Sequence, residues 1–319
     1  MPSRTIVLIA WFCLALAGCS AVGVATAPKK LASASRTTAA VKADDLFWAT
    51  FHSGAYERIP LALEAETGAY LANPGDHLSA AHTGWLHIWR LSERQRMAAQ
   101  QATITDDATL SRMYFEEAVA LNPKDARYRG FLASAILSEG AIHKDEAVTR
   151  KGYFMMLDAI KAWPEFNLFT GGYVMSSQPA NSERFKQALA WQWETLDRCV
   201  GEKVDRQTAA FAKYMTLATT EGSKRVCWNS WIAPHNFEGF FLNMGDMLVK
   251  SGDWRTGQKI YADAKLSPTY GDWKFQQVLD ARIRDAEGNI ANFNSTEPTE
   301  DARRMMNTTT FSCMACHQN

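Results

Sequence analysis

Apolar residues recur at spacings of three and four along most of the chain, and this periodicity constrains the fold more than any other feature. One example is the segment 78–89, in which Leu78, Ala81, Trp85 and Ile88 share one face of a helix. No convincing run of residues alternates between apolar and polar, as a half-buried strand would. The sequence therefore predicts an all-α fold.

Residues 241–268 have the pattern of a helical hairpin. Small residues, Gly245 and Ala264, fall where two antiparallel helices would approach, and Gly252-Asp253 would form the turn between them. Bulky residues would fill the space between the helices, and a proline would end the second one: Phe241, Met244, Leu248, Tyr261 and Pro268. This segment resembles a tetratricopeptide (TPR) repeat.

Two weaker copies of the same pattern precede that hairpin. They consist of Phe115, Ala118 and Pro123, and of Met156, Ala159 and Pro164. Repeats of this kind bury their apolar faces by stacking, and at least three are expected in a stable array. The resemblance implies a TPR-like α-solenoid over residues 44–295, a type of fold that usually binds partners along a concave surface.

The chain ends with a C-x-x-C-H motif, formed by Cys313, Cys316 and His317. This spacing is typical of covalent c-type haem attachment. Each thiol can form a thioether with one haem vinyl group, and the adjacent imidazole can ligate the iron. We expect residues 296–319 to form a short haem-binding tail, beyond the repeat body, that carries one haem c.

Two other interpretations of the motif are a zinc site and a redox-active dithiol. A structural zinc site normally has four protein ligands, and the tail supplies three. A thioredoxin-like dithiol would belong to a strand-helix-strand unit, which this sequence lacks. Neither alternative explains His317 as well as haem does.

The N-terminus has the features of an export signal. Arg4 precedes a short apolar run from Ile6 to Ala17, which is typical of a signal peptide and too short for a membrane span. The following residues, up to Cys19, resemble a bacterial lipobox. The resemblance implies that residues 1–18 are removed, that Cys19 is lipidated, and that the protein is anchored in the bacterial cell envelope, with Ser20 favouring the outer membrane. Ordinary secretion with cleavage near Ala27 is the alternative.

Residues 19–43 are rich in Ala, Ser, Thr and Lys without apolar periodicity, so we expect a solvated tether there. Of the six cysteines in the chain, Cys13 lies in the signal segment, Cys19 in the lipobox and two in the C-terminal motif. The remaining pair, Cys199 and Cys227, can form a disulfide in an oxidising compartment or remain two buried thiols.

The composition argues against a nucleic-acid partner and against a body that spans a membrane. The chain has 34 basic and 34 acidic residues, and removal of the signal segment takes away only Arg4. No basic stripe indicates a nucleic-acid surface, and no second long apolar run indicates a membrane span. Catalytic motifs of hydrolases and phosphate-binding glycine loops are also absent from the sequence.

A haem at the end of the chain needs its sixth iron ligand from elsewhere, or lacks one. His82 is one candidate, because it lies on the apolar face of segment 78–89. A core histidine with a backbone hydrogen bond is the alternative for this residue. His87 lies on the opposite face and is expected in water. His235 is a second candidate, at the start of a predicted helix that would keep its imidazole neutral. His52 has no supporting context.

The sequence therefore predicts a membrane-anchored monohaem c-type cytochrome that transfers single electrons and docks a redox partner protein or another haem protein through its helical body. A homo-oligomer is a further possibility. Such a protein would be an electron carrier rather than an enzyme. One alternative is a scaffold lipoprotein for envelope assembly, whose tail binds another metal or none. Another is an open-iron haem protein that acts as a peroxidase or gas sensor.

Overall fold

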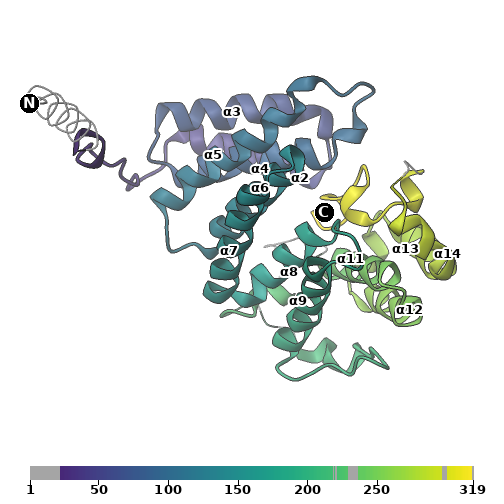
Figure 1. Cartoon of the computed structure of the whole chain (residues 1–319). Coiled ribbons are helices and arrows are strands. Elements are labelled where there is room, and N and C mark those ends of the chain that lie inside the picture. Colours follow the sequence, from purple (N-terminus) through teal and green to yellow (C-terminus); the bar gives the residue numbers. More distant parts are fainter. Residues whose placement is uncertain (1–21, 218, 220, 229–235, 297–299, 318–319) are drawn as a thin grey trace, which may run out of the picture.

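The computed structural model describes residues 22–217, 219, 221–228, 236–296 and 300–317, and the regular structure in these ranges is helical, without strands (Figure 1). The all-α prediction is therefore confirmed for the part of the chain that is described. The α-helices are α2 (Thr38–His52), α3 (Ile59–Ala72), α4 (His77–Ser92), α5 (Asp106–Leu121), α6 (Ala126–His143), α7 (Glu146–Ala162), α8 (Pro164–Met175), α9 (Glu183–Val200), α10 (Arg225–Trp228), α11 (Asn236–Lys250), α12 (Trp254–Asp263), α13 (Gln276–Arg284) and α14 (Ala286–Asn294).

Helices that follow one another in the sequence pack side by side. The closest pairs are α4 with α5, α6 with α7, α8 with α9, and α11 with α12. Further contacts join α6 to α8 and α11 to α14. In Figure 1 the C-terminal segment, drawn in yellow, lies between the group α2–α6 and the group α11–α14. This arrangement places the end of the chain among the helices.

The hairpin of α11 and α12 matches the predicted pattern closely. A Cβ on Gly245 would lie 2.2 Å from the Tyr261 ring, so only glycine allows the two helices to approach this far. Gly252 forms the turn with a φ of 96°, and the Asp253 side chain caps α12 by accepting a hydrogen bond from Thr256 N. The helix ends at Asp263, before Pro268, and a short 3₁₀ turn follows it.

The body begins earlier than the sequence indicates. Helix α2 starts at Thr38, inside the segment expected to be a solvated tether, and Ala40 and Ala43 are buried. The residues before the helix also contact the body, because Arg36 pairs with Asp76. The expected tether of residues 19–43 is therefore wrong for its last residues. Their Ala-rich sequence without apolar periodicity gave no sign of a helix, which tertiary contacts stabilise.

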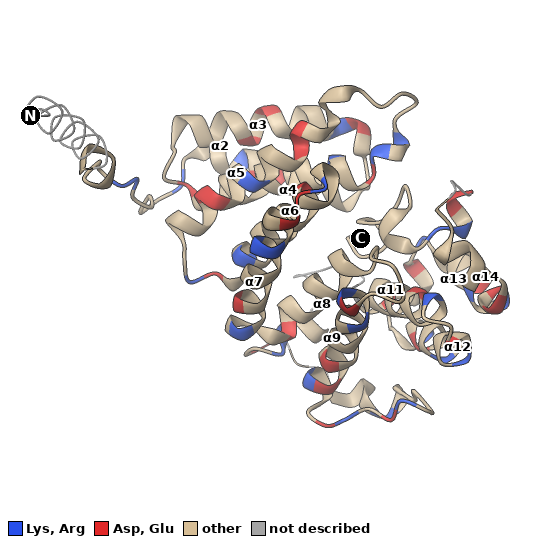
Figure 2. Ribbon diagram, viewed as in Figure 1, with Lys and Arg blue, Asp and Glu red and all other residues tan. Residues whose placement is uncertain are grey.

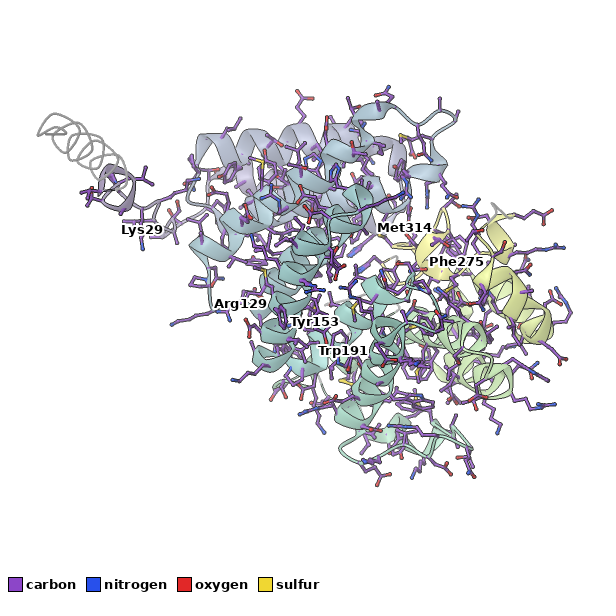
Figure 3. All side chains as sticks on the ribbon, viewed as in Figure 1. Lys29, Arg129, Tyr153, Trp191, Phe275 and Met314 are labelled. Carbon is purple, nitrogen blue, oxygen red and sulfur yellow. A yellow bond between two sulfur atoms is a disulfide. The ribbon has the colours of Figure 1, made fainter. Side chains whose placement is uncertain are left out.

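The C-terminal segment is part of the core. Met306, Met314 and Ala315 are almost completely buried in the largest hydrophobic cluster, together with residues of α2, α4, α8 and α11. Figure 3 shows the labelled Met314 on this segment, and Tyr153 and Trp191, whose rings stack 6.3 Å apart where α7 and α9 meet. The expectation that the C-x-x-C-H motif lies beyond the helical body is therefore wrong.

The surface carries charges of both signs. Figure 2 shows blue and red residues interspersed along the helices. Within the described ranges, no helix combines the length and the apolar character needed to cross a membrane.

Candidate functional site

Two buried side chains position the segment that leads to the C-terminal motif. The Asp246 carboxylate of α11 accepts hydrogen bonds from Met306 N at 2.6 Å and from the Tyr261 hydroxyl at 2.6 Å. Arg282 of α13 forms an ion pair with Asp246 and donates to the carbonyl oxygens of Ala302 and Arg304. Backbone groups that lack regular secondary structure are thus bound inside the protein, where unpaired they would be destabilising.

A third buried side chain, Glu93, binds the motif itself. Its Oε1 accepts hydrogen bonds from the backbone N–H groups of Cys313 at 2.8 Å and Met314 at 3.1 Å. Its Oε2 accepts one from Trp89 Nε1 at 2.9 Å and pairs with Arg96 at 2.8 Å. Burial raises the pKa of Glu93 to about 7, although these partners favour the carboxylate. The motif is fixed to the end of α4, about 220 residues away in sequence.

The backbone of the motif forms a tight turn. The N–H groups of Cys316 and His317 both donate to the carbonyl oxygen of Cys313, at 3.1 and 3.0 Å. On the other side of the turn, Trp273 Nε1 donates to the carbonyl oxygen of Ala315 at 2.9 Å. The turn therefore presents the side chains of residues 313, 316 and 317 from one compact backbone loop.

Both thiols of the motif are buried and are not joined to each other. Burial and the nearby Glu93 carboxylate raise the pKa of Cys313 to about 12, and burial also raises the pKa of Cys316. The Cys316 sulfur packs against α11, where a Cβ on Gly239 would lie 2.2 Å from it. Glycine at this position makes room for the thiol. Both sulfurs are protonated and therefore weakly nucleophilic in this environment.

The His317 imidazole lies among aromatic rings. Its centroid is 4.9 Å from that of Phe51 and 5.6 Å from that of Trp85. Burial, with a contribution from His52, lowers its pKa to about 3, so the ring is neutral at physiological pH. Its Nδ1 is buried and has no hydrogen-bond partner among the described residues. A neutral imidazole is the form that ligates metals.

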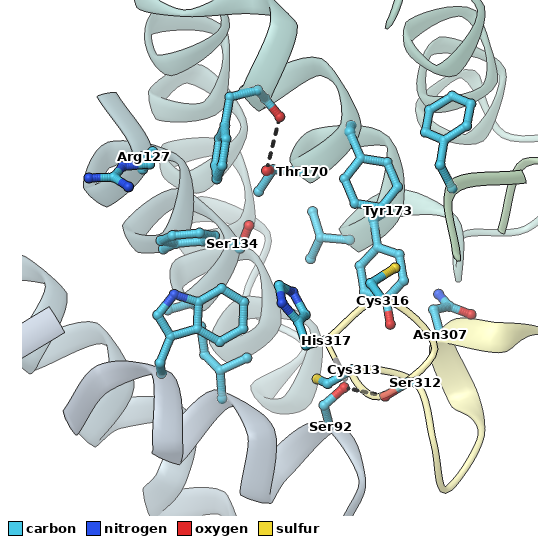
Figure 4. Close-up of a pocket in the computed structure, with 18 of the residues that line it drawn as sticks. Ser92, Arg127, Ser134, Thr170, Tyr173, Asn307, Ser312, Cys313, Cys316 and His317 are labelled. Atoms are coloured by element: carbon cyan, nitrogen blue, oxygen red, sulfur yellow. Dashed lines mark hydrogen bonds between the residues drawn. The ribbon is translucent and has the colours of Figure 1, made fainter. Parts of the chain in front are cut away.

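The motif forms part of the wall of a large cavity. The cavity has a volume of about 490 Å³, within the range of roughly 300–1,000 Å³ that is usual for pockets that bind small molecules. Its lining is mainly apolar and includes many aromatic side chains, among them Phe47, Trp85, Phe131, Phe169 and Phe240. Figure 4 shows the His317 ring in this space beside Cys313 and Cys316, with Tyr173 near Cys316.

Comparison with known proteins gives no match to a family model, to a curated protein or to a solved structure. No family is shown.

The structure brings His82 to the same cavity. The ring is buried, as expected, and stacks on Phe47 with centroids 4.1 Å apart. Its Nδ1 contacts two carboxylates, Asp44 at 2.8 Å and Glu66 at 3.0 Å. The hydrogen-bonding environment is therefore made of acidic side chains rather than of backbone groups. That His82 ligates a haem iron stays a prediction.

Other expected site residues have different outcomes. Cys199 and Cys227 form a disulfide that joins α9 to α10. His235 and Cys19 lie outside the described residues. His87 is buried, not in water, because Asp107 of α5 packs over this face and its carboxylate contacts His87 Nδ1 at 2.7 Å.

Sequence patterns did not reveal four residues around the site. Glu93, Asp44 and Glu66 sit in charged helical contexts that look like solvated faces, yet Glu66 and Glu93 are fully buried. His52, at the end of α2, is buried with an unpartnered Nε2 and affects the pKa of His317. Only tertiary packing gives these residues a role, so no local signal identifies them.

Proposed function

We propose that the protein is a monohaem c-type cytochrome that transfers single electrons. One observation carries the proposal: the C-x-x-C-H motif is folded into the wall of an aromatic cavity of about 490 Å³ instead of extending from the body. A chance motif in a flexible tail would have no reason to be next to such a cavity. Haem, when bound, would supply the one-electron redox chemistry.

The residues present fit such a group. Cys313 and Cys316 offer two free sulfurs for thioether bonds, and His317 offers a neutral ring nitrogen for the iron. Phe and Trp side chains give the flat apolar surroundings that a porphyrin ring requires. Two arginines, Arg94 and Arg127, also belong to the lining. Arg127 already pairs with Asp125 at 2.6 Å, so Arg94 is the guanidinium group that suits a haem carboxylate. The thiols and the imidazole would hold the haem, and the rings would exclude water from it.

A tetrahedral metal in the motif is supported less well. Ligand atoms of a thiolate zinc site lie about 4 Å apart, since each is about 2.3 Å from the metal. Among the described residues, a metal ion could be held by a group of three or more His, Cys, Asp or Glu whose ligand atoms lie within 4.8 Å of one another. The group that meets this condition is Asp44, Glu66 and His82. Cys313, Cys316 and His317 do not form such a group, which favours a larger ligand that separates them.

The proposed cytochrome would have a docking surface for a redox partner and an anchor in the membrane. The helical hairpins, which we interpret as a degenerate TPR-like solenoid, would dock a redox partner, and lipidation at Cys19 would anchor the protein in the outer membrane. The Cys199–Cys227 disulfide is compatible with an oxidising compartment. His82 and His235 remain the candidates for the distal iron ligand, and an iron without one would suit a peroxidase or gas sensor.

The test is a pyridine haemochrome spectrum of denatured protein, produced with its signal segment in a bacterial host that attaches haem c. We expect covalent haem in the wild type and its loss in the Cys313→Ser/Cys316→Ser variant. The matched control is Cys199→Ser/Cys227→Ser, which also loses two sulfurs and should keep its haem. Wild-type protein without covalent haem would overturn the proposal, and stoichiometric zinc that depends on Cys313 and Cys316 would point to the scaffold alternative.

The same preparation distinguishes electron carrier from gas sensor. We expect the spectrum of the reduced protein to be unchanged by carbon monoxide if a side chain occupies the distal position. A large shift in the spectrum would instead indicate an open iron. Replacement of His82 by Ala would shift the spectrum only if this residue is the distal ligand.

A further inference from the structure

A second cluster of potential ligands lies beside the cavity and is independent of the C-terminal motif. It consists of Asp44 from α2, Glu66 from α3 and His82 from α4, with ligand atoms that all lie within 4.8 Å of one another. His82 Nδ1 is 2.8 Å from Asp44 Oδ1 and 3.0 Å from Glu66 Oε1. Three helices thus converge on one point through side chains that commonly ligate metals.

The cluster has too few hydrogen-bond donors for its acceptors. His82 Nδ1 carries at most one proton, yet it contacts two carboxylates. The second oxygen of Glu66, Oε2, is buried without a hydrogen-bond partner among the described residues, and Glu66 has no exposed surface. A fully buried carboxylate with an unpaired oxygen is destabilising unless a proton or a cation compensates it.

The surrounding charges leave the cluster negative. Arg36 is the neighbouring cation, and it pairs with both Asp44 and Asp76. Three carboxylates and one guanidinium leave two negative charges when the imidazole is neutral. A divalent cation would balance this charge without a proton on His82 or Glu66.

We propose that Asp44, Glu66 and His82 bind a divalent metal ion of the Zn²⁺ or Mn²⁺ type. Two oxygens and one imidazole nitrogen form a ligand set that suits these borderline metals better than Ca²⁺, which takes oxygen ligands, or Cu⁺, which favours thiolates. Ligand atoms about 3 Å apart correspond to angles near 90° at metal–ligand distances of about 2.1 Å. That geometry leaves further coordination positions for water.

An ion can reach the cluster from one side, and its binding would join three helices. The Asp44 side chain is 15% exposed, whereas those of Glu66 and His82 are almost inaccessible, so the ion would enter from the Asp44 side. Bound there, the metal would join α3 to α2 and α4, and the last two helices form part of the cavity wall through Phe47, Trp48 and Trp85. It would stabilise the fold by binding the native state only.

The test uses the full exported chain, freed of metal with a chelator and titrated with Zn²⁺ by calorimetry. We expect one equivalent to bind to the wild type and to Cys313→Ser/Cys316→Ser, and the melting temperature of both to rise. Glu66→Gln should weaken binding at least about tenfold. The control Glu116→Gln removes a half-exposed carboxylate that pairs with Arg112, and it should bind as the wild type does.

Two outcomes would overturn the proposal. If the wild type takes up no Zn²⁺, or if Glu66→Gln binds it unchanged, the cluster is an internal network of hydrogen bonds. If Cys313→Ser/Cys316→Ser abolishes binding, the ion belongs to the C-terminal motif. Circular dichroism checks that Glu66→Gln is folded, and Asp44→Asn, at the more exposed ligand, serves as a second variant with the same expected loss of affinity.

Discussion

His82, which is buried, and His317, which is half-buried, are two histidines of the same cavity with opposite surroundings. Both pack on aromatic residues of α2: His82 on Phe47, with ring centroids 4.1 Å apart, and His317 on Phe51, at 4.9 Å. Burial by itself would lower the pKa of both. For His82, hydrogen bonds to Asp44 and Glu66 outweigh burial and raise the pKa. For His317 burial dominates and the pKa falls to about 3.

The opposite pKa shifts of the two histidines indicate that aromatic packing positions an imidazole, whereas nearby charges determine what it can bind. His317 has a neutral ring and apolar surroundings, which suit a flat, largely apolar ligand such as haem. His82 faces carboxylates, which suit a proton or a small cation. Two sites with different ligands can therefore share one cavity wall.

The largest expected effect on stability comes from removing Glu93, which binds the backbone of the C-terminal motif that carries His317. Glu93→Ala would leave the N–H groups of Cys313 and Met314, and that of the Trp89 indole, without their acceptor inside the protein. We expect the free energy of unfolding to fall by about 3–5 kcal/mol, as measured by chemical denaturation.

The control for this change is Glu116→Ala, which removes an exposed helical ion pair with Arg112 and should cost no more than about 0.5 kcal/mol. Equal effects of the two substitutions would show that Glu93 does not hold the motif. The Glu93→Ala variant should also yield less covalent haem, because its C-x-x-C turn is no longer fixed in the cavity wall.

A smaller effect on the same side is expected for Gly239→Ala. The new Cβ would lie 2.2 Å from the Cys316 sulfur and 2.8 Å from the carbonyl oxygen of Ala315, so the turn must shift. We expect the free energy of unfolding to fall by about 1–3 kcal/mol, as measured by thermal or chemical denaturation. The cluster around His82 should keep its metal affinity.

Gly288→Ala is its matched control. This glycine is also in a helix, but nothing lies within 4 Å of the position of its Cβ. The substitution should stabilise the protein by up to about 1 kcal/mol, because alanine favours the helix. If both substitutions stabilise, α11 and the motif do not pack as closely as the structure has them.

The sequence predicts the two halves of this comparison unequally. Helical periodicity and the glycines of the α11–α12 hairpin are local signals, and the fold class and the Gly245–Tyr261 contact follow from them. The C-x-x-C-H spacing identifies Cys313, Cys316 and His317, but not that the two thiols are buried, because nothing near residue 313 indicates its contact with Glu93. Asp44, Glu66 and His82 come from three helices, so their convergence depends on tertiary packing that no local pattern encodes.

The dependence of stability on pH separates the two histidines by sign. For His82, the pKa is higher in the folded state, so its stabilisation is fully present below the unfolded value of about 6.5 and is lost as pH rises through the folded pKa. For His317, the folded pKa is near 3, so stability is lost as pH falls from about 6.5 towards 3. In haem-free, chelator-treated protein, His82→Gln should therefore flatten the pH dependence of the unfolding free energy at pH values above about 6.5. His317→Gln should flatten it on the acid side.

Because other groups such as Glu93 titrate in the same range, the difference between each variant and the wild type is the quantity to compare. Flattening of the same limb by both variants would mean that the two rings have similar electrostatic surroundings, and the contrast between a haem side and a cation side of the cavity would no longer hold.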